Sequence, residues 1–231
     1  MVASQVHLVR HGEVFNPDGI LYGRLPGFGL SKLGHRMASA AADDLASRDR
    51  SMTGLRVSPL QRTRESAAPI ATALGLTPEI DDRIIEPTNH FEGTVMRRAL
   101  RNPVNWPYLV NPVRPTWGEA YKRIEKRMLA AVDDAFDSVD EGDVVLVSHQ
   151  LPIWVTHLSV SGERFWHDPR KRRCALSSIT TFERTLFQPS ELPPAPPGAP
   201  VPTEPMLRIV EVGYVEPAAS LSATATDVGA V

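Results

Sequence analysis

Short apolar runs alternate along the chain with longer segments whose apolar residues recur at helical spacing. Each short run is bounded by polar residues, glycine or proline, which is typical of a buried strand. We predict strands over residues 5–9, 55–58, 143–148, 177–182 and 206–215, with a weaker one over 79–85. The final strand is expected at an edge of the sheet.

The longer segments carry the start and stop signals of helices. Ser31 is placed to cap one helix, and Gly75 is placed to end another. Thr116 and Glu119 have the spacing of a capping box, which predicts the start of a third helix. We predict helices over residues 31–48, 60–74 and 151–161, and from 116 to about 139.

Strands that alternate with helices indicate an α/β fold. We expect a three-layer sandwich, with a mostly parallel central sheet flanked by helices. Ligand sites in such sheets lie beyond the carboxyl ends of the strands. Four residues follow the ends of predicted strands, and we expect them to meet at one edge of the sheet: Arg10, His11, Arg62 and His149.

Three segments lack any period. Residues 86–115 are rich in proline and asparagine, and their length is typical of a lid or binding loop. Residues 189–205 form a proline-rich loop, and residues 217–231 are predicted to be a disordered tail. We therefore expect a single catalytic domain over residues 1–216.

Composition narrows the classes of partner. The chain has 231 residues, of which 42% are hydrophobic and 23% charged, as in an ordinary globular domain. The formal net charge of −2 gives no global basic field, so we expect no nucleic-acid partner. The histidines lack the spacing of metal ligands, and no metal site is expected.

The cellular setting is also constrained by the sequence. Cys174 is the only cysteine, which rules out an intrachain disulfide and fits a reducing compartment. No apolar run is long enough to span a bilayer, and the first residues lack a secretory signal pattern. We expect a cytoplasmic protein without membrane contact, in which Cys174 is a buried apolar side chain.

The feature that indicates a catalytic function is an arginine directly before a histidine. A phosphate ester carries about two negative charges, so its attack needs cationic donors, a nucleophile and an acid for the leaving oxygen. Guanidinium groups match phosphate oxygens bidentately, and neutral imidazole is a competent nucleophile near pH 7. Arg10 and His11 place both groups side by side, and Gly12 is expected to let a ligand approach the backbone.

These residues belong to a set of motifs that resembles the histidine phosphatase superfamily, also called phosphoglycerate mutase-like. LVRHGE at residues 8–13 resembles the family signature, and SPLQRTRESA at 58–67 is similar to its second-arginine motif. Glu86 followed by FEG at 91–93 resembles the acid-bearing segment. VSHQLPIW at 147–154 and CALSSITTF at 174–182 resemble the second-histidine motif and the closing strand.

The resemblance implies a role for each matching residue. His11 would be the nucleophile and would be phosphorylated during turnover. Glu86 would donate a proton to the leaving oxygen. The phosphoryl group would be bound by Arg10, Arg62 and His149, with secondary contacts from Asn16 and the backbone around Gly23. The family needs no metal and no organic cofactor for hydrolysis.

The chain departs from the family pattern in places. Asn16 stands one residue closer to the histidine than is usual, and the segment after Glu86 is shorter and lacks an intervening glycine. Glu92 therefore competes with Glu86 for the role of acid. No segment resembles the long insertion of the mutases.

The resulting prediction is a cofactor-independent phosphomonoesterase that acts on a small-molecule phosphate ester through a phosphohistidine. Two alternatives stay open: a phosphoglycerate mutase and a catalytically weak phospholigand-binding module. The leaving group and the oligomeric state are not fixed by the sequence.

Some residues outside the motifs have expected places as well. Trp106 and Trp117 are candidates for substrate contact, and the basic run at 170–173 is expected to be a solvated face. A mutase would need further cations, which the lid offers as Arg97, Arg98 and Arg101.

Overall fold

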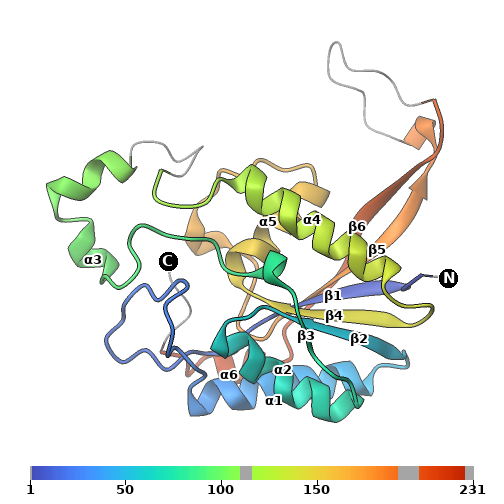
Figure 1. Cartoon of the computed structure of the whole chain (residues 1–231), viewed down its shortest axis with the longest axis horizontal. Coiled ribbons are helices and arrows are strands. Elements are labelled where there is room, and N and C mark those ends of the chain that lie inside the picture. Colours follow the sequence, from blue (N-terminus) through green and yellow to red (C-terminus); the bar gives the residue numbers. More distant parts are fainter. Residues whose placement is uncertain (1, 110–115, 192–202, 227–231) are drawn as a thin grey trace.

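A six-stranded mixed sheet forms the centre of the computed structural model, which describes residues 2–109, 116–191 and 203–226 (Figure 1). The strands are β1 (Gln5–Arg10), β2 (Met52–Val57), β3 (Glu79–Ile80), β4 (Asp143–Ser148), β5 (Ile179–Phe187) and β6 (Met206–Val215). Their order is β3-β2-β4-β1-β5-β6; the first four pair in parallel, β5 pairs antiparallel with β1, and β6 pairs antiparallel with β5. The predicted α/β class and mostly parallel sheet are confirmed, with β6 at an edge.

Helices cover both faces of the sheet and complete the three layers. Helices α1 (Lys32–Ser47) and α2 (Gln61–Leu74) lie on one face, and α4 (Tyr121–Asp137) and α5 (Gln150–Val160) lie on the other (Figure 1). Strand β4 is buried along its whole length, because alternate residues face the two layers. This two-sided burial explains its continuous apolar run.

The helix boundaries follow local signals in two cases out of three. The Ser31 hydroxyl accepts a hydrogen bond from the backbone N–H of Gly34, and Gly75 ends α2 in the left-handed region. The predicted capping box before α4 is wrong: the helix starts at Tyr121 without a side-chain cap. Glu119 instead forms a two-point ion pair with Arg127, in the second turn of the helix.

In the described residues, the segments outside these strands and helices contain short helical turns. These are η1 (Asp82–Ile84), α3 (Met96–Ala99), η2 (Pro103–Leu109), η3 (Pro169–Lys171), η4 (Pro189–Glu191) and α6 (Ala219–Ser222). The predicted strand over 79–85 is shorter than expected, because η1 follows β3 directly. Most of the proline-rich loop, residues 192–202, lies outside the described residues, as do residues 110–115 of the expected lid.

The segment after β6 differs from the disordered tail predicted by its composition. Residues 219–222 form α6, and Ala218 is fully buried in a cluster with Met37 and Leu176. The backbone N–H of Thr226 donates a hydrogen bond to the Glu13 carboxylate, 2.6 Å away. Apolar residues of this tail therefore pack against α1. Residues 227–231 lie outside the part of the chain that the structure describes.

The register of the parallel strands aligns their carboxyl ends. Arg10 of β1 lies opposite Ser148 of β4, and Val57 of β2 lies opposite Val147. The residues that follow these three strands therefore emerge side by side, as expected for a ligand site in such a sheet.

Candidate active site

Arg10 and His11 leave the sheet at the end of β1 and are both almost fully buried, at 2% and 3% exposure. Gly12 serves a different purpose from the one expected. A Cβ atom at Gly12 would lie 2.4 Å from the Gly34 carbonyl oxygen in the first turn of α1. The glycine therefore allows this helix to pack against the loop that carries His11.

One hydrogen bond fixes the tautomer of His11. Its Nδ1 lies 2.7 Å from the Gly12 carbonyl oxygen, which can only accept, so the proton sits on Nδ1. Burial, followed by the charges of Arg62 and Arg10, lowers the pKa of His11 well below 6.5. The ring is therefore neutral near pH 7, with its lone pair on Nε2.

Arg62 enters the site from the first turn of α2, just beyond β2, and is 1% exposed. Its Nη2 donates to the carbonyl of Gly23 over 2.8 Å, and its guanidinium lies 4.9 Å from the centre of the Tyr22 ring. Its Nε has no hydrogen-bond partner among the described residues. A buried donor of this kind is costly unless a ligand satisfies it.

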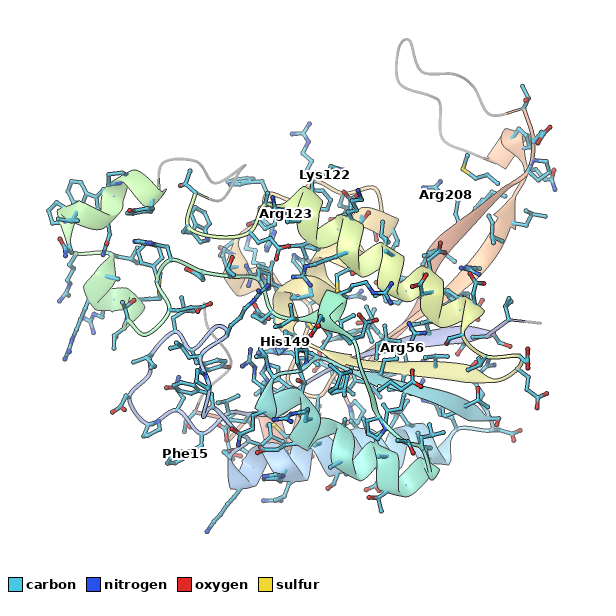
Figure 2. The ribbon with its side chains drawn as sticks, viewed as in Figure 1. Phe15, Arg56, Lys122, Arg123, His149 and Arg208 are labelled. Atoms are coloured by element: carbon cyan, nitrogen blue, oxygen red, sulfur yellow. The ribbon has the colours of Figure 1, made fainter. Side chains whose placement is uncertain are left out.

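His149 follows β4 directly and is fully buried in the interior, between the helices on the two faces (Figure 2). Its Nε2 lies 2.7 Å from the hydroxyl oxygen of Ser58, and its ring centre lies 5.3 Å from that of His11. Burial, with Arg62 and His11, lowers its pKa well below 6.5. Its Nδ1 has no hydrogen-bond partner within the described chain.

Geometry separates the two candidate acids. Glu86 lines the cavity beside His11, and its carboxylate lies 3.7 Å from His149 Nδ1. Burial raises the pKa of Glu86 against the opposing charges of Arg62 and Arg172. Glu92 instead accepts hydrogen bonds from the backbone N–H groups of Arg24 and Asn89, which organise the loop.

The cavity over these residues has a volume of about 210 Å³. Gly23 lines it, and its polar side chains are Arg10, His11, Arg62, Glu86, Thr88, Asn89, Glu119, Gln150 and Arg172. Its other walls are mostly apolar or aromatic and include Leu21, Tyr22, Phe91, Met96, Trp117 and Tyr121. His149 lies beneath this surface, in contact with the ring of His11 and close to Glu86.

Several predicted contacts lie elsewhere. The side-chain amide of Asn16 exchanges two hydrogen bonds with the backbone of Ile20, so it closes a turn and does not line the cavity. Trp106 is 58% exposed, whereas Trp117 lines the cavity as expected. The lid arginines are exposed and outside the cavity wall: Arg97, Arg98 and Arg101.

The basic run at 170–173 is not simply a solvated face. Arg172 turns into the cavity, where its Nε donates to His167 Nε2 over 2.8 Å. The neighbouring Arg173 points away and pairs with Glu211. Sequence reasoning missed Arg172 because a run of like charges normally remains in solvent.

Across residues 2–109, 116–191 and 203–226, no three histidine, cysteine or acidic side chains are grouped to hold a metal ion. In the same residues, no helix combines the length and the apolar character needed to cross a membrane.

The fold and the buried arginine–histidine cluster define a class of phosphate-processing α/β proteins, and comparisons agree. The family model of the histidine phosphatase superfamily, branch 1, matches residues 6–190. Rv0525 of Mycobacterium tuberculosis is 52% identical over 182 residues, which is 78% of this chain and 89% of that protein. The chain belongs to the histidine phosphatase superfamily.

More distant relatives and structures are named either as a phosphoglycerate mutase or as phosphatases. The "Probable phosphoglycerate mutase GpmB" of Yersinia pestis is 29% identical over 183 residues, covering 76% of this chain and 84% of that protein. The structure of the mycobacterial glucosyl-3-phosphoglycerate phosphatase Rv2419c has a TM-score of 0.65 at 20% identity, covering 91% and 99% of the two chains. The α-ribazole phosphatase of Shigella flexneri has a TM-score of 0.63 at 20% identity, covering 78% and 91%. At these identities the structures establish a shared fold.

Proposed function

We propose that this protein is a cofactor-independent phosphomonoesterase that hydrolyses a small-molecule phosphate ester through a phosphohistidine at His11. The observation that carries the proposal is the state of His11: buried, neutral and with its Nε2 lone pair unprotonated. Arg10 and Arg62 supply two buried guanidinium groups beside it. A nucleophile between two such groups suits a dianionic phosphoryl group.

The phosphoryl oxygens would be bound by Arg10, Arg62 and His149. Arg62 Nε is a buried donor that awaits an acceptor. If the Ser58 hydroxyl donates to His149 Nε2, the ring proton lies on Nδ1, which also lacks a partner in the described chain. Both donors would then gain partners when the phosphoryl group binds, and Gly23 would hold Arg62 in place through its carbonyl.

In the first step, His11 Nε2 attacks phosphorus while the bond from phosphorus to the leaving oxygen breaks. Protonated Glu86 passes its proton to that oxygen, so a neutral alcohol departs and Glu86 becomes a carboxylate. The Gly12 carbonyl accepts the hydrogen bond from Nδ1–H throughout and stabilises the positive charge that develops on the ring. Burial favours this role of Glu86 because it raises the pKa of the carboxyl group.

In the second step, water attacks the phosphohistidine. Glu86 accepts a proton from the water, the phosphorus–nitrogen bond breaks, and its electron pair returns to His11 Nε2. Inorganic phosphate leaves, and both residues regain their starting protonation states. The cycle consumes only the ester and water.

Glu86→Gln should slow alkyl phosphates far more than aryl phosphates, by roughly tenfold or more in the ratio of the two rates. An aryl oxide leaves readily without a proton, whereas an alkoxide does not. The measurement compares kcat/KM for glycerol 3-phosphate and 4-nitrophenyl phosphate in both enzymes. Equal losses with the two substrates would remove Glu86 from the role of acid.

Glu92→Gln is the matched control for this experiment. A glutamine oxygen can still accept the hydrogen bonds from Arg24 and Asn89, so the loop should keep its shape. We expect the ratio of the two rates to stay within about twofold of the unmodified enzyme. A leaving-group dependence confined to Glu92→Gln would assign the acid to Glu92.

A phosphoglycerate mutase is the second candidate, since one relative carries that name. A mutase must grip the second anionic group of a bisphosphorylated intermediate and exclude water. The lid arginines that would supply this grip are exposed and do not line the cavity. These arginines therefore supply no such grip; the lack of a segment that resembles the long mutase insertion is what favours hydrolysis.

The assay that separates the two functions uses 3-phosphoglycerate with and without 2,3-bisphosphoglycerate. We expect phosphate release to match or exceed formation of 2-phosphoglycerate, with no dependence on the bisphosphate. Primer-dependent interconversion that outpaces phosphate release by orders of magnitude would make the protein a mutase. Binding of vanadate without turnover of any ester, including 4-nitrophenyl phosphate, would indicate a catalytically weak binding module.

A further inference from the structure

Arg172 is a partly buried cation with only neutral partners. Its Nε donates to His167 Nε2 over 2.8 Å, and its Nη1 donates to the Gln150 side-chain oxygen over 3.3 Å. Within the described part of the chain it makes no ion pair, and its Nη2 makes no hydrogen bond. The charge that acts on it most strongly is that of Glu86, but no hydrogen bond or ion pair joins the two side chains in the described residues. Partial burial of a cation without a paired anion is costly, so the position indicates an anionic ligand.

A chain of hydrogen bonds holds the guanidinium in one orientation. His167 Nδ1 lies 2.6 Å from the Phe165 carbonyl oxygen, which can only accept, so Nδ1 carries the proton and Nε2 accepts from Arg172. Burial lowers the pKa of His167 and thereby favours this neutral form. The remaining Nη1 and Nη2 hydrogens of Arg172 are left for another acceptor.

The position of Arg172 separates it from the phosphoryl-binding arginines. The charges that lower the pKa of His11 are those of Arg62 and Arg10. Arg172 is not among those charges, and its hydrogen-bond partner His167 has its ring centre 6.1 Å from that of Tyr121, which also lines the cavity. Arg172 therefore belongs to the Tyr121 wall of the cavity, from which its charge acts on Glu86, the group that would meet the leaving oxygen.

The other charged group on this wall is already neutralised. Glu119 lines the cavity, but its carboxylate oxygens accept hydrogen bonds from Arg127 over 3.1 and 3.0 Å. Leu21, Phe91 and Trp117 contribute apolar surface. While Glu86 is protonated as the proposed acid, a leaving group in this cavity thus meets apolar walls and one cation without a counter-charge, at Arg172.

We propose that Arg172 is a specificity-determining residue that binds a carboxylate on the leaving group, so that the preferred substrates are carboxylate-bearing phosphate monoesters. A guanidinium edge pairs bidentately with a carboxylate. The small cavity, about 210 Å³, also holds the phosphoryl group and therefore favours a carboxylate over a bulkier second phosphate. This inference rests on the phosphomonoesterase activity proposed above.

The test uses two pairs of substrates that differ in one charge. The first pair is 3-phosphoglycerate and glycerol 3-phosphate; the second is 4-carboxyphenyl phosphate and 4-carbamoylphenyl phosphate. Arg172→Gln should reduce kcat/KM for the carboxylate member of at least one pair by roughly tenfold or more. The uncharged member should change by less than about twofold, because it never contacts the guanidinium edge as an ion pair.

Two further variants keep the result interpretable. Arg173→Gln removes the neighbouring charge, which pairs with Glu211 outside the cavity, and should leave both ratios unchanged. Arg172→Lys keeps the charge but loses the fork, so its preference for the carboxylate should fall between those of the parent and Arg172→Gln. Each readout is the ratio of kcat/KM for the two members of a substrate pair, measured with one enzyme preparation. A partly unfolded sample lowers both values equally and therefore leaves the ratio unchanged.

The outcomes distinguish this inference from the function on which it rests. Equal losses for charged and uncharged members would overturn the role of Arg172 while leaving the phosphomonoesterase intact. The same holds if Arg172→Gln has no effect on either pair. Absence of hydrolysis of every ester, including 4-nitrophenyl phosphate, by the unmodified protein would overturn the proposed function itself.

Discussion

His11→Ala should reduce the rate of ester hydrolysis by at least ~10³, because it removes the nucleophile and leaves only substrate binding and electrostatic stabilisation. The loss should appear in kcat for both alkyl and aryl phosphates. Steady-state kinetics with 4-nitrophenyl phosphate and glycerol 3-phosphate would measure it. Because the pKa of His11 is lowered, kcat/KM of the parent should keep its value as the pH falls through 6.5.

His35→Ala is the matched control, since His35 is an exposed histidine on α1. We expect its rates to stay within about twofold of the parent. A His11→Ala enzyme that retained more than a tenth of the parent activity would show that another group attacks phosphorus.

Arg62→Lys should reduce kcat/KM by roughly 10² or more, although the charge is kept. The guanidinium of Arg62 donates to the Gly23 carbonyl and lies over the Tyr22 ring, and its buried Nε–H has no partner among the described residues. A lysine offers one point charge at the end of a flexible chain and cannot supply the paired N–H donors of a guanidinium group. The loss should be similar for every substrate, since all share the phosphoryl group.

Arg64→Lys provides the comparison, because Arg64 is exposed on the same helix two residues later. Its rates should match those of the parent enzyme. If Arg62→Lys slowed one substrate and spared another, Arg62 would recognise the leaving group and would not bind the phosphoryl group.

The sheet and the centre of the site could be predicted because their signals are local. A short β-rich run predicts β1 and a continuous apolar run predicts β4, and the polar residues that follow mark the carboxyl end of each strand. Since parallel strands end at the same edge, His11 and His149 were expected to meet, and their ring centres lie 5.3 Å apart. The choice of Glu86 over Glu92 needed the structure, because both carboxylates lie in one irregular loop.

The remaining differences arise from long-range contacts. Arg172 enters the cavity because His167 and Gln150 hold its side chain, and neither partner is visible in a run of basic residues. Thr116 and Glu119 match a capping box, but the ion pair of Glu119 with Arg127 takes precedence. Likewise, the tail orders because Ala218 fills a space against Met37 on α1.

The most direct test of the central claim is chemical trapping of the phosphorylated enzyme. The protein would be mixed with 4-nitrophenyl phosphate, quenched within milliseconds in base and digested for peptide mass spectrometry. We predict a phosphoryl group on His11 that survives alkali and is lost in acid, and that is absent from His11→Ala. A phosphoryl group on another residue, or turnover without any covalent adduct in an enzyme that releases phosphate, would contradict the account.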